Sequence, residues 1–72
     1  MEREKFYYEL KEVLGAKNDI NEETYLNLTS LTTLGLIVFL DENFGKQISS
    51  SDLKKAEKVA DLILLIGLDR IE

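Results

Sequence analysis

The 72-residue chain contains no cysteine, no histidine and no proline. Without cysteine it can form no disulfide, and without cysteine and histidine it lacks the usual ligands of structural zinc. A domain of this length has a core of marginal size, so packing of its many Leu, Ile and Val side chains must hold it together. The lack of proline suits short helices with tight connections. We therefore expect a single domain over residues 1–72.

Positive charge is also scarce. Nine Lys and Arg stand against 14 Asp and Glu, which gives a net charge of −5. A nucleic-acid binder needs a basic face, so this balance argues against one and favours partners that present Lys and Arg. No apolar run approaches the length of a membrane span, and residues 1–5 are too charged to begin a signal peptide. We expect a cytoplasmic protein that binds no nucleic acid and does not insert into membranes.

Apolar residues at helical spacing predict an all-α fold, a small bundle of three main helices and one short helix with a long first loop. The expected helices are about Glu2–Leu14, Ser30–Phe44, a short one beginning within Ser49–Ser51, and about Ala56–Ile66. Gly15, Gly45 and Gly67 are expected to end the three main helices. The polar stretch 16–29 is expected to be a loop. The side chains expected to fasten it to the core are Ile20, Tyr25, Leu26 and Leu28.

The helix expected at 30–44 carries more apolar residues than one buried face needs. Those expected in or beside the core are Leu36, Leu40 and Phe44, with Leu31, Thr33 and Ile37 next to them and Phe39 near a flank. Leu34 and Val38 fall on a different side. Either the bundle buries this helix nearly all round, or these two residues form an exposed stripe for a partner, and the pattern alone leaves both open. Gly35, inside the helix, costs about 1 kcal/mol relative to alanine.

Ser30 stands at the start of this helix, but the chain offers it no catalytic partner. A nucleophilic serine usually needs a histidine to take its proton, and no Ser-x-x-Lys spacing follows Ser30. Asp41-x-Asn43 matches the start of a calcium loop, but Gly45 and Lys46 do not fit the rest of that motif. We therefore expect neither an enzyme nor a metal site.

Taken together, these residues resemble the acyl carrier proteins, over nearly the whole chain. The matching residues are Leu14-Gly15 after the first helix, Ile20, Thr24 and Leu26 in the loop, Thr29-Ser30-Leu31 where the family has Asp-Ser-Leu, Asp41-Glu42 and Phe44 at the end of the second helix, Ile48, Asp52-Leu53, and residues 59–62. Each motif is weak alone, and their common order and spacing make the resemblance specific.

The resemblance implies that Ser30 bears 4′-phosphopantetheine, which a separate phosphopantetheinyl transferase attaches from coenzyme A. The arm would bring the thiol that the protein lacks, and its phosphodiester would lie near the positive end of the helix dipole. The remaining partners would be acyl-transferring or synthase enzymes with basic surfaces, met by a monomeric carrier. The residues expected to bind partners are Thr29, Leu31, Leu34, Val38, Asp41, Glu42 and Asp52. The core of such a carrier would loosen enough to shelter a carried chain between the second and fourth helices, lined by Leu40, Leu62 and Ile63.

Two positions depart from the family. Thr29 stands where the family usually has Asp. Its hydroxyl can still cap the helix, but it cannot supply the carboxylate that, in the family, helps the phosphopantetheinyl transferase and its metal ion engage the site. Gly35 replaces a common Glu and so removes a second negative charge. These departures favour a specialised carrier outside ordinary fatty-acid synthesis.

Three alternatives remain open at this stage. Ser30 or Thr29 could serve only as the cap of the helix. The chain could be a carrier-like interaction module that is never modified and binds a protein through Leu34, Val38 and the acidic residues. It could also be an unrelated small helical regulator, such as an antitoxin or adaptor, that dimerises.

Overall fold

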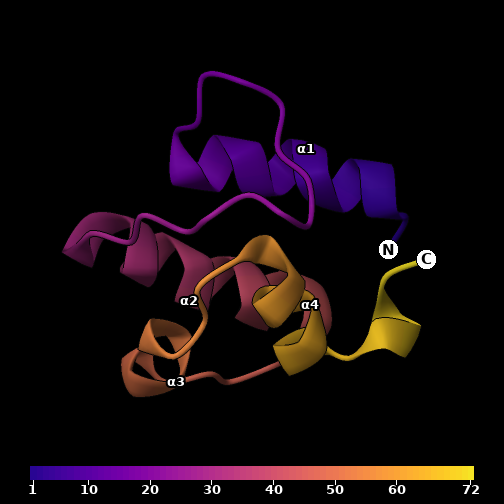
Figure 1. Cartoon of the computed structure of the whole chain (residues 1–72). Coiled ribbons are helices and arrows are strands. Elements are labelled where there is room, and N and C mark those ends of the chain that lie inside the picture. Colours follow the sequence, from indigo (N-terminus) through magenta and orange to yellow (C-terminus); the bar gives the residue numbers. More distant parts are fainter.

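The computed structural model describes all 72 residues, and all its regular elements are helices, without a β-strand (Figure 1). Helix α1 spans Arg3–Leu14, α2 Ser30–Phe44, α3 Ser50–Lys54 and α4 Val59–Ile66, and a short 3-10 helix, η1, follows at Leu68–Arg70. Helices α1 and α3 both contact α2, which is the longest element. The predicted bundle of three main helices, one short helix and a long first loop is confirmed. None of these helices combines the length and apolar composition that crossing a bilayer requires.

Most helix ends lie where the sequence predicts them. Helix α2 has the predicted bounds, and Gly15 and Gly45 end α1 and α2 with left-handed φ angles of +67° and +64°. Helix α1 begins one residue later than expected, because the backbone of Glu2 is still extended and Glu2 is the N-cap.

The start of the last helix was predicted wrongly: α4 begins at Val59 and not at Ala56. The preceding residues pair instead with the long loop in an extended conformation. The amide of Leu26 donates to the carbonyl of Glu57 at 2.8 Å, and the amide of Val59 donates to the carbonyl of Thr24 at 2.9 Å. These bonds between distant segments satisfy backbone groups that a longer helix would have used internally.

The carboxylate of Asp61 closes the N-terminus of α4. It accepts hydrogen bonds from the amides of Glu57 at 2.8 Å and Lys58 at 3.0 Å. The Lys58 ammonium lies 5.2 Å from the centre of the Tyr25 ring and pairs with Glu23 at 3.3 Å. Tyr25 is exposed, with the Lys58 ammonium over its ring. The expectation that Tyr25 fastens the loop to the core is therefore wrong. The loop is held there by its backbone.

The core consists of 14 buried side chains, all hydrophobic. They include the expected core residues Leu36, Leu40 and Phe44 of α2, together with Phe6 and Leu10 of α1 and Val59, Leu62, Ile63 and Ile66 of α4. Thr33 and Ile37 are half-buried beside them, as expected. Phe39 was expected near a flank, but it is only 8% exposed, and the centre of its ring lies 6.1 Å from the centre of the Phe6 ring. No polar or charged residue is buried as a whole, although one carboxylate oxygen of the half-buried Glu9 is enclosed without a hydrogen-bond partner.

The C-terminal residues close the bundle near the N-terminus (Figure 1). Ile71 is buried, and the amide of Glu72 donates to the carbonyl of Met1 at 2.9 Å. The Arg70 guanidinium donates to the carbonyl of Phe44 at 2.6 Å and so binds the C-terminal end of α2. Helical periodicity predicted none of these contacts, because they depend on residues 26 or more positions away.

Candidate functional site

Thr29 is the cap of α2. Its hydroxyl oxygen accepts a hydrogen bond from the amide of Thr32 at 3.2 Å, and the Thr32 hydroxyl accepts one from the amide of Thr29 at 2.8 Å. This reciprocal pair is a capping box, with threonine in the place that Glu or Gln usually takes. The cap that the sequence allowed to either Thr29 or Ser30 therefore belongs to Thr29.

Ser30 is the first residue of α2, and its side chain is exposed. Its hydroxyl forms no hydrogen bond within the protein, although a serine at a helix start commonly caps it. Since Thr29 already caps the helix, the Ser30 hydroxyl is not needed as a cap.

Ser30 lines an open groove of about 510 Å³ between α2 and α3, which we call the serine groove. The residues that line it are Leu28, Thr29, Ser30, Thr33, Leu34, Ile37, Ser50 and Lys54. Lys54 is the only charged side chain among them, and it forms no ion pair within the protein. The groove therefore combines a free hydroxyl, an apolar wall and one unpaired cation.

Six of the predicted site residues share one exposed face of α2. At about 100° per residue, they fall within an arc of roughly 120°. They are Ser30, Leu31, Leu34, Val38, Asp41 and Glu42, and all are exposed. The placement of Leu31 beside the core is therefore wrong: it is 80% exposed, on the face opposite the buried residues of the helix. The question left open for Leu34 and Val38 is answered, since they are 60% and 46% exposed.

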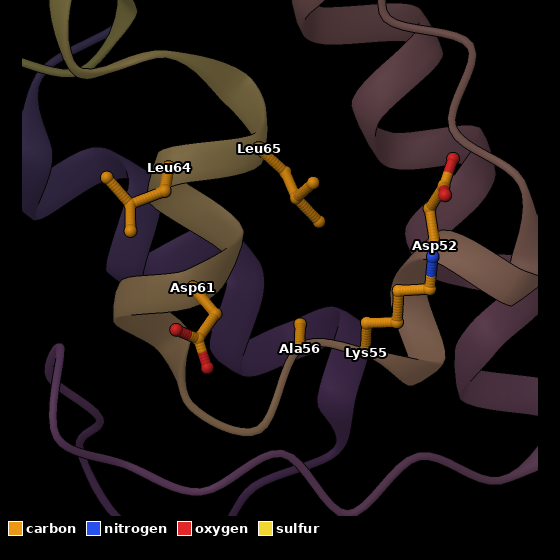
Figure 2. A pocket seen from close by; sticks show the side chains of 6 residues that line it. All are labelled: Asp52, Lys55, Ala56, Asp61, Leu64 and Leu65. Atoms are coloured by element: carbon orange, nitrogen blue, oxygen red, sulfur yellow. The ribbon is translucent and has the colours of Figure 1, made fainter.

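The predicted acidic residues do not gather at the serine. Asp41 and Glu42 line a second groove of about 490 Å³, farther along α2, which also contains Ile37 and Ile48. Asp52 lies elsewhere, in a cavity between α3 and α4. Figure 2 shows Asp52 and Lys55 on one side of that cavity and Leu65 of α4 on the other. Asp41 and Glu42 thus lie farther along α2 than Ser30, whereas Asp52 lies on α3 between Ser50 and Lys54 of the serine groove.

Gly35 does not belong to the exposed arc of α2. A Cβ at this position would lie 3.4 Å from a methyl carbon of Val13, so the position faces α1. A small residue here lets α1 approach α2 closely. The missing side chain thus affects helix packing more directly than it affects the charge beside Ser30.

The expected shelter for a carried chain is closed in this structure. Leu40, Leu62 and Ile63 pack together in the core, at most 2% exposed. A chain could be held among them only if the core opened. The open apolar surface next to Ser30 is instead formed by Leu28, Leu34 and Ile37.

Two features of the surface were missed by the sequence analysis. Lys54 lies in the serine groove although it is 24 positions from Ser30, and a lysine in a short helix gives no signal of this kind. Leu64 and Leu65 are exposed on α4, where periodicity alone identified only the inward residues. Comparisons with protein-family models, with curated proteins and with solved structures gave no match.

Proposed function

We propose that this chain is an acyl carrier protein that bears 4′-phosphopantetheine on Ser30 and presents acyl or aminoacyl groups to partner enzymes. The observation that carries the proposal is the exposed Ser30 hydroxyl, left free because Thr29 caps α2, in an open groove. The motif resemblance of the chain supports the same position.

The residues of the serine groove fit the group. Ser30 supplies the hydroxyl, and Lys54 supplies a cation for the negative charge of a phosphodiester. Leu34 and Ile37 supply apolar contact for an arm lying against α2. When attached, the arm supplies a terminal thiol for a thioester, which a chain without cysteine cannot form itself.

We expect attachment to need a separate phosphopantetheinyl transferase, because no base of the protein is hydrogen-bonded to the Ser30 hydroxyl. The Ser30 oxygen attacks the phosphorus of coenzyme A that bears the pantetheine. A new oxygen–phosphorus bond forms, the bond to the departing 3′,5′-adenosine bisphosphate breaks, and a base of the transferase takes the hydroxyl proton. In this step the protein contributes an exposed, uncapped hydroxyl on a rigid helix end.

The test is intact mass after incubation with coenzyme A and a broad-specificity phosphopantetheinyl transferase. We expect one phosphopantetheine on the wild type and none on Ser30→Ala. Ser50→Ala is the matched control, because Ser50 also begins a helix and lines the same groove, and this variant should be modified like the wild type. An unmodified wild-type chain under several transferases would refute the proposal and favour an interaction module that is never modified.

A further inference from the structure

Lys54 is the one charged side chain that lines the serine groove, and it forms no ion pair within the protein. It lies in the last turn of α3, whereas Ser30 begins α2 on the other wall of the groove. A lysine carries its ammonium on a flexible four-carbon stem, so it can move toward an anion placed in the same groove.

The two charged neighbours of Lys54 on α3 line a different cavity. Asp52 and Lys55 lie on one side of the cavity between α3 and α4 (Figure 2), and neither lines the serine groove. Two residues turn a helix by about 200°, so the side chains of Asp52 and Lys54 leave α3 on nearly opposite sides. No carboxylate in the serine groove therefore competes for Lys54. Lys55 has the same charge and is also exposed, which makes it a matched control.

The apolar wall of the groove follows α2 away from Ser30. Leu34 lines it, and Ile37 lines both this groove and the second groove farther along the helix. In phosphopantetheine two methyl groups stand close to the phosphate. An arm that is fixed at its phosphate by Lys54 would bring these methyl groups to the apolar wall, where contact removes them from water.

We infer that Lys54 is a positioning residue that pairs with the phosphodiester on Ser30. The pair holds the arm in the serine groove, against Leu34 and Ile37, when no partner is bound. The inference rests on the proposed function and adds where the arm lies and which side chain keeps it there. An exposed ion pair contributes little and is screened by salt, whereas a lysine that only supported the end of α3 would act with or without the arm.

The first test compares melting temperatures with and without phosphopantetheine in about 50 mM NaCl. The change on modification should be about 2–4 °C more favourable in the wild type than in Lys54→Gln. Lys54→Arg and Lys55→Gln should respond to modification as the wild type does, because one keeps the charge in the groove and the other removes a charge outside it. At about 500 mM NaCl the wild type should respond like Lys54→Gln.

The second test locates the arm by NMR. Nuclear Overhauser effects between the pantetheine methyl groups and the methyl groups of Leu34 and Ile37 should be present in the wild type and in Lys55→Gln. They should be lost in Lys54→Gln and restored in Lys54→Arg, which a role confined to the stability of α3 would not produce.

Three results would overturn the inference and leave the proposed function intact, provided that the wild type accepts the arm. Lys54→Gln may shift the melting temperature equally with and without the arm, the arm contacts may be unchanged in this variant, or it alone may fail to be loaded. The last result would assign Lys54 to the encounter with the transferase. A wild-type chain that no transferase modifies overturns the proposed function and the inference together.

Discussion

Replacing glycine by alanine is expected to have opposite effects on stability at two positions, Gly35 within α2 and Gly45 directly after it. Gly35 lies within the helix, with space for a methyl group 3.4 Å from Val13. Gly45 ends the helix with a φ of +64°, in the left-handed region. Alanine should therefore stabilise the protein at position 35 and destabilise it at position 45.

The magnitudes follow from the two backbone conformations. Inside a helix, alanine is favoured over glycine by about 0.8–1.0 kcal/mol, and a 3.4 Å contact with Val13 requires little movement. We expect Gly35→Ala to raise the free energy of unfolding by about 0.5–1 kcal/mol. In the left-handed region, alanine costs about 1–2 kcal/mol, and the lower entropy of the unfolded chain offsets part of this cost. Gly45→Ala should therefore lower the free energy of unfolding by about 1 kcal/mol.

The assay is thermal and urea unfolding followed by far-UV circular dichroism. In a domain of this size, 1 kcal/mol shifts the melting temperature by about 4–8 °C, so the two variants should differ by roughly 10 °C. If Gly35→Ala instead destabilises the protein by about 0.5 kcal/mol or more, Val13 lies too close, and glycine is required for the approach of α1 to α2. Loading of Ser30 should not change in Gly35→Ala, because position 35 faces α1.

Three further predictions test the cap, the α4 start and the C-terminal contact. Thr29→Ala should lower stability by about 1 kcal/mol in urea unfolding, and Thr29→Asp should retain most of it, since Asp also caps; equal losses would contradict the capping box. Amide hydrogen bonds from Lys58 and Glu57 lower the pKa of Asp61 below its ordinary 3.8, so their stabilisation is complete above that value and disappears as the pH falls through the lowered pKa. The melting temperature of the wild type should therefore fall more steeply than that of Asp61→Asn between about pH 4 and pH 2, and parallel curves would contradict this. Ile71→Ala should cost about 2–4 kcal/mol because the side chain is buried, against almost nothing for the exposed Glu72→Ala.

Local signals in the sequence predicted the elements whose ends are satisfied locally. The bounds of α2 follow from a capping threonine before it and a glycine after it, and both act within one helical turn. The start of α4 could not be found in this way, because Thr24 and Leu26 of a distant loop bind the backbone ahead of it. The local signal at this start is Asp61, whose carboxylate accepts hydrogen bonds from the amides of Glu57 and Lys58.

The candidate site was predictable in part for the same reason. Helical geometry places Leu34 and Val38 on the face of Ser30, and only the packing of α1 and α3 on the other faces shows that this side stays open. The same geometry places Leu31 on this face, about 100° from Ser30, so its exposure follows from helical spacing. Lys54 joins the site through tertiary packing of α3 beside α2, which no spacing in the sequence encodes.

The net charge of the chain does not describe its candidate site. Five excess negative charges favour basic partners when the composition is considered alone. Around Ser30, however, the cap of α2 is the uncharged Thr29. The nearest charged side chain in the groove is a lysine, and the first acid on that face is about three helical turns away. The surface in contact with Ser30 is therefore apolar with one lysine, Lys54, although the protein as a whole is acidic.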